Sequence, residues 1–208
     1  YHVDATISLA KYLKKVDPDL EIDFICLFSQ HDKNATPISF PDITVKNGFL
    51  DKNDTLKVAG HELMNYLFGI ANLKIFLFNS SKLRDYRNIQ LMIHLRSKLI
   101  KEHYDAINFV GNHRLVILLN VLTKAKLKFH MIHEPFPHHK SFSKRALSER
   151  KFLMKLLIRS ASHITVPSLV SYDRFLSNWK IAKNKISIVY FSHLEIYREY
   201  LKKEIKKS

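Results

Sequence analysis

The chain of 208 residues has few of the residues that interrupt or cross-link a fold: 4 glycines, 6 prolines and one cysteine. It shows no low-complexity tract and no repeat with a period of about 20 to 50 residues, which excludes solenoids and propellers. The lone Cys26 excludes an internal disulfide and fits a reducing compartment. The longest apolar stretches, such as residues 115–122, are far shorter than the roughly 20 residues that cross a bilayer.

Several catalytic signatures are also missing. The residues contain no Walker loop, dinucleotide-binding glycine motif, nucleophile elbow or kinase signature. His133, Glu134, His138 and His139 cluster in the sequence, but Pro135 and Pro137 disfavour the helix that a zinc-binding His pair needs. We therefore expect no metal site.

Acidic residues are scarce relative to basic ones. Thirty-four Lys and Arg stand against nineteen Asp and Glu, which gives a net charge of +15 and a pI near 9.8. This excess implies attraction to something anionic, and nucleic acid, a membrane surface and a phosphorylated substrate all remain open. A basic surface that serves only solubility is the alternative.

What is present is a near-regular alternation of helical and strand-like segments, with 46% apolar residues. Helices are expected at 3–16, 55–68, 83–100, 114–123, 143–159 and 170–178, and strands at 21–28, 105–110, 129–132, 164–166 and 186–191. The segment 73–78 fits either element, and 43–45 is a possible short strand in a polar loop. This order predicts an α/β fold, a Rossmann-like parallel sheet with helices on both faces. Ligands of such sheets bind in the loops after the strands.

Residues 160–192 carry a resemblance to a known family. They read SASHITVPSLVSYDRFLSNWKIAKNKISIVYFS, and upstream a strand runs into His133, Glu134 and Pro135. This arrangement resembles the end of the first domain of family 4 glycosyltransferases, and the helix expected at 2–15 is similar to the first helix of that family. Together the matching segments cover about half of the chain in the family's order.

The resemblance implies one half of a GT-B architecture, in which two Rossmann-like domains face each other across a cleft. Residues 1–192 would form the N-terminal, acceptor-side domain and 193–208 an interdomain linker or tail. The first strand and its Gly-rich loop would precede Tyr1, and a C-terminal donor-binding domain would follow. The nucleotide-sugar donor is expected on that C-terminal domain, so we expect no cofactor here and no activity from this chain alone.

His133 is the first candidate site residue, because it follows a predicted strand at the cleft edge. There an imidazole can contact a sugar hydroxyl or phosphate and exchange a proton near neutral pH. The alternative is a structural His that bonds a neighbouring backbone carbonyl. His130 alternates to the opposite face of the strand and is interpreted as a plain strand residue.

Acceptor-binding candidates are Gly111, Asn112, Arg114, Glu134 and Ser168. Gly111 permits close backbone approach, Asn112 offers a donor and an acceptor, and Arg114 can fork onto a phosphate. A plain turn in which Asn112 caps the next helix is the alternative. Ser168 occupies the family's Ser position, and a helix N-cap is a sufficient structural explanation for it.

The helix expected at 143–159 is strongly basic, with most of its apolar side expected to pack on the sheet. Its cations Lys144, Arg145, Lys151 and Lys155 are expected to face an anionic membrane surface. The full enzyme would transfer a sugar to a glycan or lipid-linked acceptor, with retention at the anomeric carbon, in the cytoplasm or at the inner face of the membrane.

Two alternatives remain to this function. A basic nucleic-acid-binding domain fits the charge, but the aromatic residues fall in predicted core strands and do not alternate with exposed cations, so nucleic acid is a poor partner. A non-catalytic interaction domain of the same fold also remains open.

Overall fold

The computed structural model describes residues 2–29, 45–80, 82, 85–111, 113–132 and 144–190. Contacts divide the chain into two compact units, which we call the N-unit (Val3–Leu95) and the C-unit (Arg96–Phe191). The helices and strands of the N-unit are α1 (His2–Val16), β1 (Asp23–Ser29), β2 (Gly48–Phe49), α2 (Lys52–Leu67), β3 (Asn72–Phe78) and the first part of α3 (Arg87–Lys101). The expectation that residues 1–192 form one domain stays a prediction.

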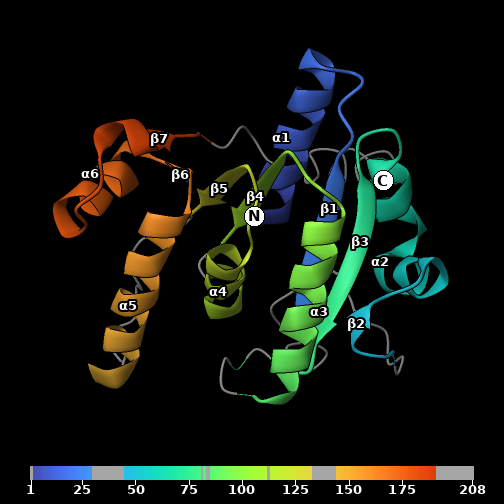
Figure 1. Cartoon of the computed structure of the whole chain (residues 1–208). Helices are drawn as coiled ribbons and strands as arrows, with labels where there is room; N and C mark the ends of the chain where they lie inside the picture. Colours follow the sequence, from blue (N-terminus) through green and yellow to red (C-terminus); the bar gives the residue numbers. More distant parts are fainter. Residues whose placement is uncertain are drawn as a thin grey trace, which may run out of the picture. The chain divides into compact units, whose positions relative to one another are not determined.

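The N-unit contains a three-stranded sheet in the order β1-β3-β2 (Figure 1). β1 and β3 are parallel in register from Asp23 opposite Asn72 to Ser29 opposite Phe78, whereas β2 pairs with β3 antiparallel. The segment that could be strand or helix is therefore the strand β3. The antiparallel β2 departs from the parallel pairing that the alternation predicted, and the possible strand at 43–45 falls largely outside the described residues.

The two faces of β3 are covered by different helices. Ile75 and Leu77 form a buried cluster with Val58 of α2 and Cys26 of β1. Phe76, on the opposite face, contacts the ring of Phe49 edge to face, with centroids 4.9 Å apart, and lies 6.3 Å from the ring of His94 on α3. Consecutive apolar residues in β3 thus reflect burial on both faces, which is typical of a parallel strand.

Helix α2 has a side-chain cap at its start and a kink at one glycine. Asp51 caps this helix by accepting a hydrogen bond from the Asp54 backbone N–H at 2.8 Å. Gly60 lies inside the helix with φ 76°, so the helix is kinked there. This conformation is accessible to glycine and strained for other residues.

The C-unit is built on a four-stranded, all-parallel sheet in the order β4-β5-β6-β7. Its elements are β4 (Ala106–Val110), α4 (Arg114–Leu122), β5 (Leu127–Met131), α5 (Lys144–Ser160), β6 (His163–Val166), α6 (Leu169–Asn178), a short 3-10 helix (Lys183–Lys185) and β7 (Ile186–Ile188). Each strand pairs with the next one along the chain, as right-handed βαβ units do.

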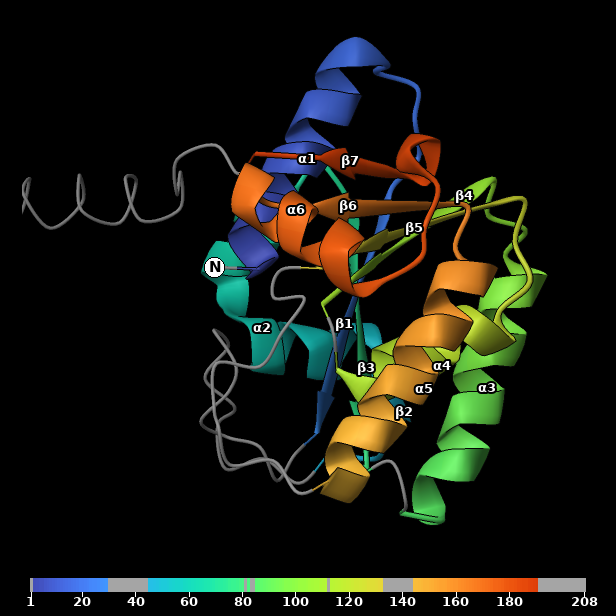
Figure 2. The same ribbon diagram turned by 90° about the vertical axis from the view of Figure 1, so that its left-hand side faces the viewer.

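Helices flank this sheet, with α4 and α5 side by side and α6 packed against β6 and β7 (Figure 2). Phe109, Ile164 and Val166 are buried from the strands, and Leu157 and Phe175 from the helices. These observations confirm the predicted α/β class and a Rossmann-like fold. None of the helices in the described parts is both long and apolar enough to cross a membrane.

Two boundaries and the burial of one helix differ from expectation. The helix expected from residue 83 begins at Arg87. Asp85 precedes the helix, and its carboxylate accepts a hydrogen bond from the Arg87 backbone N–H. The strand expected at 186–191 ends at Ile188, and the next two residues are described without strand structure. On α5, Leu153, Met154 and Leu157 are buried, but Phe152 is exposed, so the apolar side of that helix is only partly covered.

Candidate functional site

The loop after β4 contains the candidate residues Gly111 and Arg114. Gly111 adopts φ 97°, a conformation that favours glycine. A Cβ added there would meet nothing within 4 Å, so the backbone angle and not crowding explains the glycine. The Gly111 N–H donates to the Met131 carbonyl at 2.9 Å, which ties the loop to the end of β5.

The other side of Gly111 is held by a buried histidine. His130 is fully buried on β5, and its Nε2 lies 2.7 Å from the Gly111 carbonyl oxygen. Its Nδ1 lies 3.3 Å from Nδ2 of Asn120, a fully buried residue of α4. The Asn120 Oδ1 accepts a hydrogen bond from the Ser160 hydroxyl at 2.8 Å. A chain of polar contacts therefore runs from the end of α5 to the candidate loop.

These partners define the protonation of His130. A carbonyl oxygen only accepts, so Nε2 carries a proton and donates it to Gly111. The Asn120 amide donates to Nδ1, which must then be unprotonated. Burial lowers the pKa of His130 to about 4, opposed in part by the bond to Gly111. His130 is thus a neutral imidazole in a single tautomer at physiological pH.

A second side chain on the same face of β5 reinforces this arrangement. The Lys128 ammonium is buried and donates to the carbonyls of Asn120 at 3.0 Å and Thr123 at 3.1 Å, at the C-terminal end of α4. Burial lowers the pKa of Lys128, with the nearby Lys185 adding to the effect. A cation at this end of a helix satisfies carbonyls that lack intrahelical partners. Lys128 and His130 together fix α4 on the sheet.

Arg114, expected to fork onto a phosphate, is the first residue of α4 and pairs with Glu149 of α5 at 3.1 Å. The N-cap of α4 is His113, whose Nδ1 accepts from the Leu115 N–H at 3.4 Å. Asn112 itself lies outside the described residues. A ligand role for Arg114 stays a prediction.

Ser168 is the N-cap of α6, after the end of β6. Its hydroxyl oxygen accepts from the Ser171 N–H at 3.1 Å and lies 3.1 Å from the Ser171 hydroxyl oxygen. The capping role offered from sequence is confirmed, while contact with a ligand stays a prediction. The cap positions the N-terminal end of α6 at the same sheet edge as Gly111, because the strands are parallel.

Other candidates fall outside what the structure places. His133 and Glu134 follow Ile132, whose N–H donates to the Thr165 carbonyl at 2.9 Å, but both residues lie outside the described ranges. Lys144 and Arg145 belong to α5, with side chains that are not described. Lys151 and Lys155 are exposed on that helix. Within the described ranges, no three His, Cys, Asp or Glu side chains gather to hold a metal ion.

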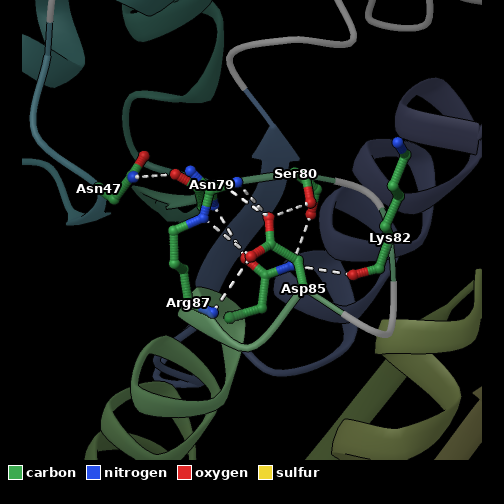
Figure 3. Close-up of polar contacts among 7 residues, drawn as sticks. Asn47, Asn79, Ser80, Lys82, Asp85 and Arg87 are labelled. Carbon is green, nitrogen blue, oxygen red and sulfur yellow. Dashed lines mark hydrogen bonds and ion pairs between the residues drawn. The ribbon is translucent and has the colours of Figure 1, made fainter.

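The N-unit holds a second network, in the loop after β3, that sequence reasoning missed (Figure 3). Asp85 accepts hydrogen bonds from Ser80 Oγ at 2.7 Å and Asn79 Nδ2 at 2.8 Å. Arg87 contacts the same carboxylate through Nε at 2.9 Å and Nη2 at 3.0 Å. This two-point contact is the strong geometry for an arginine and a carboxylate.

Asn88 completes this network from the first turn of α3. Its Oδ1 accepts from the Asn79 N–H at 3.0 Å, and its Nδ2 donates to the carbonyls of Ser80 at 2.8 Å and Lys82 at 3.1 Å. The bonds from Arg87, Ser80 and Asn79 hold the pKa of Asp85 well below its usual range, against the effect of burial. Asp85 is therefore charged at neutral pH, and its carboxylate joins Asn79, Ser80 and Arg87.

Both networks bind protein groups, so their role is to position loops. In a parallel α/β sheet these loops are where ligands bind. Signals for both existed in the sequence. Asn120 is a lone amide in an apolar helix and needs a buried partner, and the apolar run of β3 ends in Asn79 and Ser80, with Asp85 five residues after Ser80. The chain matches no protein-family model and no curated protein sequence.

Proposed function

We propose that the chain is the acceptor-side domain of a glycosyltransferase with GT-B architecture. It would bind a glycan or lipid-linked acceptor, while a nucleotide-sugar donor occupies a C-terminal domain, with retention at the anomeric carbon. The observation that carries the proposal is the position of Gly111, whose carbonyl accepts from neutral His130 at the carboxyl edge of a parallel sheet.

The chemistry of this edge suits a sugar more than a metal or a nucleophile. Gly111 offers backbone close to a ligand, and Arg114 is part exposed beside it and retains guanidinium donors beyond the one that contacts Glu149. A sugar is recognised by such fixed donors and acceptors, because a rigid site loses less entropy on binding. His133 would contact the acceptor hydroxyl and accept its proton or orient it during transfer.

The first test uses the chain itself. Calorimetric titration with uridine and guanosine diphosphate sugars should show no specific heat, because the proposal assigns the donor site to another domain. An array of defined oligosaccharides should retain the chain, and Gly111→Ala should weaken that retention. Tight binding and turnover of a nucleotide sugar by this chain would overturn the assignment of domains. An array on which no oligosaccharide retains the chain would count against acceptor binding.

The second test uses the chain joined to its donor domain. His133→Ala should lower sugar transfer on the order of a hundredfold, the usual cost of losing a positioned acid, base or donor. Its melting temperature should stay unchanged, because the proposed role is chemical. A variant that melts lower and transfers sugar at the original rate would identify His133 as a structural residue.

A further inference from the structure

The charge of this protein is divided unequally between its two units. Residues 1–95 contain eleven Lys and Arg and eleven Asp and Glu, so their formal net charge is zero. Residues 96–191 contain eighteen Lys and Arg against five Asp and Glu, a net charge of +13. Almost all of the excess of +15 therefore belongs to the C-unit.

Part of this charge forms an ordered row on α5. Lys151, Lys155 and Arg159 are exposed and recur every four residues, so they share one face of the helix. None of the three has an acidic partner among the described residues. Glu149, the only acid of this helix, contacts Arg114 on α4 and leaves the row uncompensated.

Apolar side chains border this row. Leu147 is four residues before Lys151 and 40% exposed, and Phe152 is three residues before Lys155 and 60% exposed. The opposite side of the helix is buried through Leu153, Met154 and Leu157, so the orientation of α5 is fixed by the core. The exposed row is thus held outward as a part of the fold.

We infer that the outward face of α5, consisting of Leu147, Lys151, Phe152, Lys155 and Arg159, docks on an anionic lipid bilayer. Cations interact with lipid phosphates, while an aromatic and an aliphatic side chain enter the boundary between headgroups and acyl chains. Nucleic acid explains the cations but offers an exposed leucine no apolar environment. This inference does not depend on sugar transfer.

The experiment is cosedimentation of the chain with phosphatidylcholine vesicles, with and without phosphatidylglycerol, at low salt. The chain should bind only the anionic vesicles. Lys151→Gln, Lys155→Gln and Arg159→Gln together should weaken binding on the order of a hundredfold, since each cation near the surface contributes about fivefold. A matched control, Lys15→Gln, Lys46→Gln and Lys52→Gln, removes the same charge from exposed N-unit sites and should bind as the wild type does.

Phe152→Ser separates the apolar contribution from the electrostatic one. It should weaken binding roughly tenfold at any salt concentration, because burial of an apolar ring is not screened, whereas the loss caused by the glutamine variant should shrink as salt rises. Melting followed by fluorescence of Trp179, the single tryptophan, should be unchanged in both variants.

Three results would overturn the inference. One is failure to bind anionic vesicles at low salt. Another is equal weakening by the control, which would indicate diffuse charge and no docking face. The third is complete displacement from vesicles by RNA at equal phosphate, which would identify nucleic acid as the preferred partner. None of these measurements uses a sugar donor or acceptor, so this inference and the proposed function fail separately.

Discussion

The loop after β3 in the N-unit is held by the charged carboxylate of Asp85, whereas the loop after β4 in the C-unit is held by the neutral imidazole of His130. Both groups have pKa values below their ordinary ranges, but for different reasons. Hydrogen bonds from Arg87 and neighbours favour the charged form of Asp85, and burial disfavours the charged form of His130.

The use of a charged carboxylate in one unit and a neutral imidazole in the other parallels the net charge of each unit. The N-unit compensates its cations internally, as in the pairs Lys74 with Asp23 and Lys57 with Asp54. The C-unit has too few acids to do so: its loop after β4 is held by neutral His130 and Asn120, and its buried cation Lys128 donates to backbone carbonyls. Two similar sheet edges are thus stabilised by opposite electrostatic means, and the comparison can be tested in one molecule.

Two natural probes separate the units. Trp179 is the only tryptophan and lies in the C-unit, and Cys26 is the only cysteine and lies buried in the N-unit. Burial raises the pKa of Cys26 to about 12, so its thiol is unreactive until the N-unit opens. Fluorescence therefore reports on one unit and thiol labelling on the other.

The largest expected effect is that of His130→Ala. Removing a fully buried ring leaves a cavity and orphans the Gly111 carbonyl, which together should cost about 3 kcal/mol in free energy of unfolding. The urea midpoint of unfolding followed by Trp179 fluorescence should fall. The midpoint followed by Cys26 labelling should fall less. His130→Gln, which retains a donor, should lose less. An unaltered Trp179 transition would show that the network does not hold the C-unit.

Acidification should separate the units next. The unfolded state protonates histidine below its ordinary pKa near 6.5, whereas folded His130 titrates at about 4, so stability falls as pH decreases from about 6.5 to 4. The full loss is about 3 kcal/mol. Asp85 contributes stability that is lost only below the ordinary aspartate range. The change in Trp179 fluorescence should therefore occur at a higher pH than the labelling of Cys26. The labelling uses a disulfide reagent that is active in acid. Coincident transitions would contradict the comparison.

A smaller effect is expected from two matched glycine substitutions. Gly111→Ala and Gly60→Ala each place a side chain at positive φ, which costs about 1 to 2 kcal/mol. Gly111→Ala should destabilise the C-unit, which Trp179 reports, and Gly60→Ala should destabilise the N-unit, which Cys26 reports. Thermal melts with both probes give the measurement. Equal shifts of both probes in each variant would show that the units unfold as one.

The smallest effect should come from Asp85→Asn. Asparagine has nearly the same shape and retains one acceptor, but it loses the charge paired with Arg87; the Arg87 side chain is 59% exposed and the Asp85 side chain is 8% exposed. Solvent around the guanidinium weakens the pair, and salt screens it further. Cys26 labelling should become slightly faster, and the difference from wild type should shrink at high salt. A loss as large as that of His130→Ala would contradict screening on the Arg87 side.

Sequence alone determined the α/β class and the place of most helices and strands. Apolar periodicity encodes burial locally, which is why α1, α4, β5 and α6 lie where their patterns predicted. The short apolar run that became β3 did not discriminate, because a buried strand and a buried helical turn have the same composition. The two-residue β2 is set by pairing with β3, which no local pattern reveals.

In the candidate site too, local sequence patterns predicted some features and long-range contacts decided others. Gly111, Arg114 and Ser168 are candidates because each follows a predicted strand, and only the capping role of Ser168, which has a local signal, is confirmed. His130 was interpreted as a plain strand residue, although it bonds residues 10 and 19 positions away in the sequence. Periodicity shows which residues are buried, but the partner of a buried polar group depends on contacts between distant segments. Only the tertiary structure decided those partners, because long-range pairing determines whether a buried imidazole remains neutral and what it holds in place.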